Sequence, residues 1–397
     1  MSSVNAEKPV KKEGGKASKR FWRFLQWFAP RFVIRRFRYS CDRIEVEGPC
    51  LIVANHVTDL DPFFVGVAHK DSPVAFVASE HIFRMGLVSK VINALLAPIP
   101  RSKAASGAST VKNCLRRLRA GESVGLFAEG DRSWDGLTHA VFPATGKLTK
   151  AAGVPLVTFR IEGGYLSSPR WADTVRPGRM HGTLVHTYSA EELKAMTAEE
   201  VTAAIDRDIF EDAWARQLAE PVVYESKAPA EGMERAFVVC PGCGRIGTLR
   251  SRGNAVFCPE CGFKASVDKN GFFEEGAPFR TPAEWDEWQK NELASLVRSG
   301  KSMSMGEPVL CRFSELDEGG GKSKKLGSVL LDADMGSGEL IAGDMRFPLE
   351  GIANMSMVRA NRLLFTSPEG YYELKCKKGV LRKYLLLWQA ERAVRGS

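Results

Sequence analysis

Two cysteine pairs place the strongest local constraint on how this 397-residue chain can fold. The segments Cys240-Pro-Gly-Cys243-Gly and Cys258-Pro-Glu-Cys261-Gly share one pattern, and 14 residues separate them. Each segment forms a turn that ends in glycine, here called a knuckle, and supplies two of the four thiolate ligands of a tetrahedral site. Two knuckles therefore predict a closed, structural site for one Zn²⁺. A redox dithiol is the competing interpretation, but it does not require two near-identical copies.

The positive charge of the chain is concentrated near its N-terminus. The formal net charge is +9, and residues 1–38, with eleven Lys or Arg and two Glu, account for all of it. The remaining residues therefore balance to zero. Residues 1–18 are polar and rich in Lys, Gly and Ser, which predicts a disordered tail.

Residues 19–38 have a different character, because large apolar side chains interleave with arginines and no acid is present. This composition predicts an amphipathic helix lying in an anionic membrane interface. A helix packed on the protein body and a nucleic-acid-binding arm are the competing interpretations. Residues 21–28 include six large apolar side chains, which make no favourable contact with the phosphate backbone of a nucleic acid. We therefore expect a membrane contact and no nucleic acid.

The expected location is the cytoplasmic face of a membrane, with peripheral or monotopic attachment. No apolar run approaches the roughly 18 residues of a transmembrane helix, and the first residues do not resemble a signal peptide. The five cysteines outside the knuckles are scattered, which is typical of a reducing compartment.

Residues 39–221 alternate strand-like and helix-like segments. Short apolar runs end at glycine, proline or polar clusters, and segments with helical spacing of apolar residues follow them. This alternation predicts an α/β domain with a mixed, partly parallel sheet flanked by helices.

One turn in this domain carries a histidine and an acid. The apolar run 51–54 is predicted to be a buried strand, and Asn55, His56 and Asp61 follow it before Pro62 begins a helix. Across such a turn the Asp61 carboxylate reaches one imidazole nitrogen and leaves the other facing a substrate. The competing interpretation is an ordinary loop histidine beside a capping acid.

A second polar cluster follows the predicted strand 123–128. Glu129, Gly130, Arg132 and Ser133 combine an acid, a turn-forming glycine, an arginine and a hydroxyl, which favours binding of an oxyanion or phosphate. A charged surface turn is the competing interpretation. Because both clusters follow strands of one predicted sheet, we expect them to converge at one edge.

These blocks resemble the motifs of the glycerolipid acyltransferase family, whose best-known members are the lysophosphatidic acid acyltransferases. The family's Asn-His-x-x-x-x-Asp block corresponds to the cluster at His56, and its Phe-Pro-Glu-Gly-Thr-Arg-Ser block corresponds to residues 127–133. Arg101 corresponds to the arginine of another block, and 154–159 resembles the Val-Pro-Ile-Val-Pro block. The resemblance spans roughly residues 45–165.

The resemblance implies transfer of a fatty acyl group from coenzyme A or acyl carrier protein to the free hydroxyl of a lysophospholipid. The expected acceptor is 1-acylglycerol-3-phosphate, which would give phosphatidic acid. His56 would be the general base and Asp61 its partner, with no catalytic cofactor. The residues expected to bind substrate are Asn55, Arg101, Glu129, Gly130, Arg132 and Ser133.

Two positions depart from the family pattern. Ala128 stands where the family usually has proline, and Asp131 replaces threonine or asparagine. A negative charge beside Arg132 leaves the acceptor open, with glycerol-3-phosphate, another lysophospholipid or an amine lipid as alternatives. A non-catalytic lipid- or protein-binding protein is a further alternative.

The rest of the chain is predicted to form smaller units. Residues 222–235 read as a linker, 236–268 as a zinc ribbon and 280–300 as a connecting helix with a capping box. Residues 306–397 contain short strand-like runs and a final helix, which resembles a pleckstrin-homology-like (PH-like) domain. Such a domain would bind lipid headgroups or a protein partner.

Overall fold

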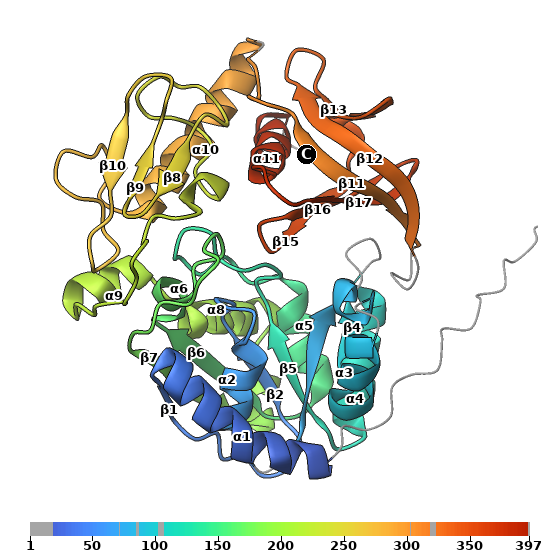
Figure 1. Cartoon of the computed structure of the whole chain (residues 1–397). Coiled ribbons are helices and arrows are strands. Elements are labelled where there is room, and N and C mark those ends of the chain that lie inside the picture. Colours follow the sequence, from blue (N-terminus) through green and yellow to red (C-terminus); the bar gives the residue numbers. More distant parts are fainter. Residues whose placement is uncertain are drawn as a thin grey trace, which may run out of the picture.

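The computed structural model describes residues 19–70, 72–84, 87–101, 107–301, 303–317 and 323–395. A sheet with helices on both faces forms one end of the molecule, and a small three-stranded unit and a larger β domain lie at the other (Figure 1). The predicted tail, 1–18, lies outside the described residues.

The first sheet has seven strands in the order β1-β7-β6-β2-β5-β3-β4. All neighbouring pairs are parallel except β6 and β7. The mixed, partly parallel α/β class predicted from the sequence is therefore confirmed. The strands are β1 Tyr39–Cys41, β2 Leu51–Ala54, β3 Val74–Ser79, β4 Ile99–Arg101, β5 Ser123–Phe127, β6 Leu156–Glu162 and β7 Met180–Tyr188.

Helices cover both faces of this sheet because its central strands are apolar on both sides. In β2, Ile52 and Ala54 belong to one buried cluster, whereas Leu51 and Val53 belong to another. The helices of this region are α1 Lys19–Phe37, α2 Asp61–Ala68, η1 Glu80–Arg84, α3 Leu87–Leu96, α4 Ala108–Arg119, α5 Ala144–Ala152, α6 Gly164–Ser167, α7 Ala190–Ala195, α8 Ala198–Ile209 and α9 Ala213–Ala219.

Helix α1 packs on the body through one side and exposes large apolar side chains on another. Trp22 is buried against Gly66 of α2, where an added Cβ would lie only 3.1 Å from the indole. In contrast, Phe24, Trp27 and Phe32 are 52%, 60% and 46% exposed. Among the described residues, no helix combines the length and the apolar character needed to cross a bilayer.

The four cysteines lie in a small unit with a three-stranded antiparallel sheet. This unit packs on α10, where the rings of Phe237 and Trp285 stack with centroids 4.6 Å apart. Thr281 caps α10 by accepting the backbone N–H of Glu284. The elements are η2 Met233–Arg235, β8 Arg250–Arg252, β9 Ala255–Phe257, β10 Lys264–Ser266 and α10 Pro282–Ser299.

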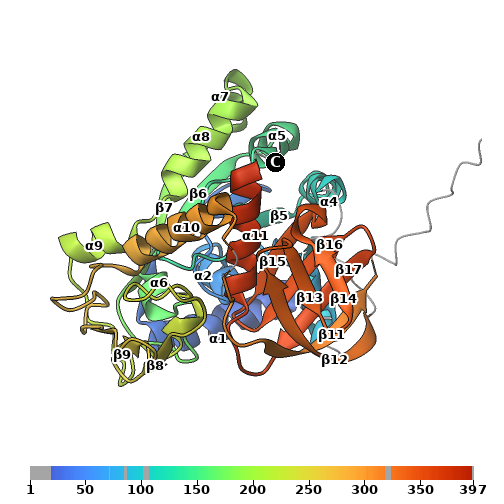
Figure 2. The same cartoon turned by 90° about the horizontal axis from the view of Figure 1, so that it is seen from above.

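The β domain has seven antiparallel strands in the order β14-β13-β12-β11-β17-β16-β15, and the last helix, α11, packs beside them (Figure 2). Tyr384 of α11 is buried and donates its hydroxyl to the Leu331 carbonyl. The elements are β11 Val309–Leu316, β12 Ser323–Asp334, β13 Glu339–Ala342, β14 Met345–Pro348, η3 Leu349–Gly351, β15 Asn354–Val358, β16 Arg362–Ser367, β17 Gly370–Cys376 and α11 Arg382–Arg395.

Candidate active site and four-cysteine site

Two loops meet at one edge of the first sheet. Strands β2 and β5 are parallel neighbours, and Ala54 pairs in register with Phe127 at their carboxyl ends. The loop with His56 and the loop with Glu129 therefore leave the sheet side by side, although 73 residues separate these two residues. The predicted convergence of the two polar clusters occurs.

His56 and Asp61 form a hydrogen-bonded pair. The Nδ1 atom of His56 lies 2.7 Å from Oδ2 of Asp61, which is fully buried. With the Nδ1 proton donated to this carboxylate, Nε2 is the proton-accepting nitrogen. The side chain of His56 is 25% exposed, so the pair is held inside the protein while the imidazole remains accessible.

The loop itself fixes the carboxylate of Asp61. The backbone N–H groups of Val57 and Thr58 donate to Asp61 at 2.7 and 2.9 Å, and the Thr58 hydroxyl donates at 2.7 Å. Phe127 then stacks on the imidazole of His56, with ring centroids 4.7 Å apart. The loop donors thus hold Asp61, and the Phe127 ring holds the imidazole of His56. The two residues are fixed in the geometry of a general base and its partner.

Glu129 joins the two loops through backbone contacts. Its Oε1 accepts the backbone N–H of His56 at 2.6 Å, and its Oε2 accepts that of His139 at 2.7 Å. Burial raises the pKa of Glu129 to about 8, against the opposing effect of these two N–H groups. In this placement Glu129 orients the loop that carries His56.

Arg132 is 8% exposed and donates to three different oxygens. Its Nε reaches the Val57 carbonyl at 3.1 Å, Nη1 reaches Asp59 Oδ1 at 2.8 Å, and Nη2 reaches the Ser168 carbonyl at 3.1 Å. The guanidinium therefore ties both loops together. A phosphate would have to share or displace the contact with Asp59.

Arg101 reaches the second loop from β4. Its guanidinium lies over the Phe142 ring, 5.0 Å from the centroid. Gly130 has φ +77°, and an added Cβ there would lie 2.2 Å from the Phe142 ring and 3.0 Å from Nη1 of Arg101. Only glycine fits this turn. Burial lowers the pKa of Arg101, although the charge of Asp131 acts in the opposite direction.

Two residues predicted to bind substrate are enclosed by protein atoms. Asn55 is fully buried and exchanges two hydrogen bonds with the backbone of Ile161 on β6, at 3.0 and 2.7 Å. Ser133 is 2% exposed and donates to Asp135 at 3.0 Å. Both side chains position the loops, and their placement gives no support to direct substrate contact.

Asp131 is neutralised within the structure. Its carboxylate accepts from Arg170 at 2.8 Å, and Arg170 also donates to the backbone carbonyl of Met357 in the β domain. The negative charge that departs from the family pattern thus has a buried cationic partner. Its pairing could not be read from the sequence, since Arg170 lies 39 positions further on.

Asp59 is a further residue of the site whose role the sequence does not reveal. It pairs with Arg132 and, at 3.3 Å, with Nε of Arg359 from the β domain. Burial raises the pKa of Asp59, but the two arginine charges outweigh burial and hold the pKa below its usual value. The only available signal was its position within the polar cluster that follows β2.

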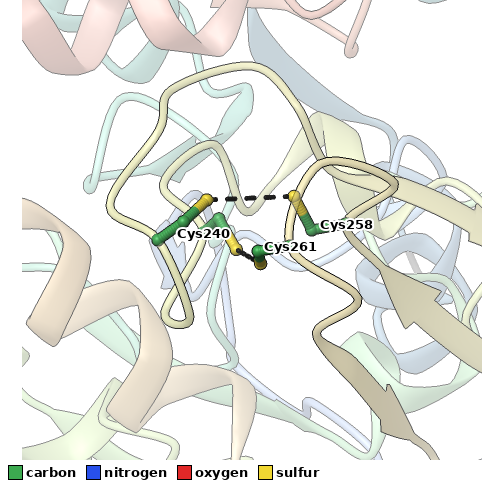
Figure 3. A group of neighbouring side chains, drawn as sticks. Cys240, Cys258 and Cys261 are labelled. Atoms are coloured by element: carbon green, nitrogen blue, oxygen red, sulfur yellow. Dashed lines mark hydrogen bonds between the residues drawn. The ribbon is translucent and has the colours of Figure 1, made fainter.

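The four cysteines come together as the second chemical site. Figure 3 shows the thiols converging from the two knuckles. The Sγ atoms of Cys240 and Cys261 are 3.7 Å apart, those of Cys243 and Cys258 are 4.0 Å apart, and all four lie within 4.8 Å of one another. This group is compact enough to hold one metal ion.

Comparisons with known proteins show that the region of the first sheet is similar in sequence to acyltransferases. Residues 36–162 match the sequence model of the Acyltransferase family. Over 121 residues, the chain is 27% identical to the chloroplastic 1-acyl-sn-glycerol-3-phosphate acyltransferase BAT2 of Brassica napus. This match covers 30% of the chain, and the chain spans about a third (34%) of that relative's length.

A solved structure is also similar. The crystal structure of the 1-acyl-sn-glycerophosphate (LPA) acyltransferase PlsC from Thermotoga maritima aligns with a TM-score of 0.38 and 19% sequence identity. The alignment covers 47% of this chain and 78% of that chain.

Proposed function

We propose that this protein is an O-acyltransferase of phospholipid synthesis. It moves a fatty acyl group from a thioester to the free hydroxyl of a lysophospholipid, with 1-acylglycerol-3-phosphate as acceptor and phosphatidic acid as product. The observation that carries the proposal is the fixed pair of His56 and Asp61 beside the loop of Glu129 and Arg132. The family match over residues 36–162 supports it.

The chemistry follows from what ester formation needs. Nε2 of His56 accepts the proton of the acceptor hydroxyl while that oxygen attacks the thioester carbonyl. Asp61, which accepts from Nδ1, stabilises the imidazolium that forms. The C–S bond then breaks, the ester forms, and the imidazolium returns its proton to the departing thiolate. No covalent intermediate on the protein is needed.

The acceptor phosphate is assigned to the arginines at the sheet edge. Arg132 lies at the junction of both loops, and Arg101 lies beside Gly130. Guanidinium groups match a phosphate with paired N–H donors. The pairing of Asp131 with Arg170 supports this assignment, because it removes a repulsive charge from the phosphate side.

The acyl chains are assigned to the side of the molecule that carries α1. Phe76 stacks on Phe127, which stacks on His56, and Phe76 also lies among apolar side chains of α1, α2 and α3, which form an apolar side next to His56. The exposed Phe24 and Trp27 with the arginines of α1 suit an anionic membrane surface. We therefore propose peripheral attachment at the cytoplasmic face.

The four cysteines are proposed to hold one structural Zn²⁺. Zinc–thiolate bonds of about 2.3 Å in a tetrahedron place sulfur atoms about 3.8 Å apart. The Cys240–Cys261 and Cys243–Cys258 separations of 3.7 and 4.0 Å fit that spacing. When bound, such an ion would stabilise the ribbon and supply no reaction step.

The β domain is proposed to be PH-like. Seven antiparallel strands and a C-terminal helix against them, α11, support that assignment. It contacts the first polar loop through the pair of Arg359 and Asp59, and it reaches the second through Met357, whose carbonyl accepts from Arg170, the partner of Asp131. This position suits a part of the enzyme that shapes the site.

An acceptor panel tests the proposed function. The full chain is incubated with radiolabelled acyl-coenzyme A or acyl carrier protein and with separate acceptors: 1-acylglycerol-3-phosphate, glycerol-3-phosphate, other lysophospholipids and an amine lipid. The expected product is labelled phosphatidic acid from the first acceptor. Transfer to another acceptor only would move the assignment to that lipid, and no transfer to any acceptor would refute it.

A further inference from the structure

A large basic cavity lies where the first sheet region, the ribbon and the β domain meet. Its volume is about 840 Å³, in the range of sites for whole small ligands. Among the described residues, eight Lys or Arg and four Asp or Glu side chains line it. Because Arg170 is paired with Asp131, which lies outside the lining, a surplus of three positive charges is left. The chain beyond residue 38 has no net charge, so this surplus is a local concentration.

Several of the lining cations are available to a ligand. Lys377 and Lys378, which follow β17, are exposed and have no ion pair among the described residues. Nη1 of Arg250 donates to the backbone carbonyls of Gly247 and Leu249. Its Nη2 lies 3.8 Å from Glu307, a side chain that is 91% exposed, so the charge of Arg250 is only weakly paired. These three cations come from the β domain and the ribbon.

The cavity reaches the candidate active site at one end. Asp59 and Arg132 line it, and Arg359 bridges to Asp59 from the β15–β16 turn. Arg359 holds φ +52°, a conformation unusual for a residue other than glycine and frequent at ligand clamps. Buried Arg170 also lines the cavity, and its Nε has no hydrogen-bond partner.

We infer that this cavity binds a multiply phosphorylated ligand next to the acyl-transfer site. Clustered lysine and arginine side chains in a concave site are what several phosphate groups require. Among its described residues, the segment 36–162 contributes only Asp59 and Arg132 to the lining, and the rest of the lining comes from within residues 168–175, 234–250 and 307–383.

Two sources share this chemistry: the phosphorylated nucleotide end of coenzyme A and the headgroup of an anionic lipid. The structure favours the soluble source. Helix α1, the proposed membrane contact, lies at the end of the molecule away from the β domain (Figure 1). A bilayer that engages α1 would therefore not cover the cavity. If the ligand is coenzyme A, the inference rests on the proposed function.

Binding without turnover tests the inference. The full zinc-loaded chain is titrated with free coenzyme A by calorimetry, and in parallel it is sedimented with phosphatidylcholine vesicles with and without a phosphoinositide. The variant is Lys377→Ala/Lys378→Ala. The control is Lys324→Ala/Lys325→Ala, which removes two adjacent exposed lysines of the same domain that do not line the cavity.

We expect coenzyme A to bind, with affinity reduced about tenfold in the Lys377/Lys378 variant and unchanged in the control. Binding only to phosphoinositide vesicles, with the same dependence on Lys377 and Lys378, would identify the ligand as a lipid headgroup. No binding of either probe, or equal losses in both variants, would overturn the inference. Neither outcome requires acyl transfer, so failure of the proposed function is detected separately.

Discussion

The two chemical sites of this protein are assembled in opposite ways. The four cysteines lie within 22 residues of one another, and each pair is held by its own short knuckle. The site of His56 draws on loops 73 residues apart, which meet only because β2 and β5 are parallel neighbours. One site depends on local sequence and the other on the topology of the sheet. They should therefore fail differently when single residues are changed.

The largest effect is expected at the partner of the imidazole. Asp61→Asn keeps the size of the side chain but replaces a carboxylate that accepts four hydrogen bonds from the loop. We expect kcat to fall by about 10³- to 10⁴-fold, because His56 loses its tautomer and the stabilisation of its charge. Initial rates measure the effect, with Asp344→Asn, an exposed turn residue, as control. A loss below tenfold would argue against the pair.

The cysteine site should show the reverse pattern, with large effects on stability. Cys258→Ser, or a strong chelator, is expected to lower the free energy of unfolding by more than about 4 kcal/mol, because the ribbon shares one buried cluster with the β domain. Calorimetry and metal analysis check this. Cys41→Ser, outside the cluster, is the control. Purified protein with far less than one zinc per chain would contradict the assignment.

Substitution of Arg132 distinguishes a role in binding the acceptor from a purely structural role. Arg132→Lys retains a charge but loses the fork that reaches three oxygens. If this guanidinium holds the acceptor phosphate, KM for 1-acylglycerol-3-phosphate should rise about tenfold with a smaller change in kcat. An unchanged KM together with a lower melting temperature would leave Arg132 as a link between the loops only.

A further prediction concerns the dependence of stability on the protonation of Glu129. Burial raises the pKa of this carboxyl to about 8 from its ordinary 4.5. The stability that the protonated carboxyl contributes is therefore complete at pH values below its ordinary pKa. It is lost as the pH rises from there through the pKa in the folded protein. Glu129→Gln, which stays uncharged, should flatten the fall in unfolding free energy across that interval. Urea unfolding at several pH values measures the slope, and equal slopes would contradict the assigned protonation.

The contrast between the sites also explains what the sequence could predict. The cysteine group and the pair of His56 and Asp61 are short-range, so spacing alone indicated them. The placement of Glu129 followed from two strands ending at one sheet edge. The role of Asn55 could not be predicted from the sequence. Its hydrogen bonds to Ile161 join residues 106 positions apart and depend on β2 lying next to β6.

Ion pairs between segments that are far apart in the sequence lay beyond prediction for the same reason. The pairs Asp131–Arg170 and Asp59–Arg359 join segments whose proximity is created by packing. Polar strands were also hard to identify: β7, next to the edge strand β1, and β15, at the edge of the sheet in the β domain, have no long apolar run. The basic cavity arises from such packing, since its lining comes from three separated parts of the chain.

The most direct test of the central claim is the rate of acyl transfer in His56→Ala, compared with the native chain and with His186→Ala, an exposed histidine on β7. Removal of the general base should lower kcat at least as much as Asp61→Asn, by about 10³- to 10⁴-fold, with the melting temperature nearly unchanged, whereas His186→Ala should match the native rate. A folded His56→Ala chain that acylates 1-acylglycerol-3-phosphate at the native rate would contradict the account.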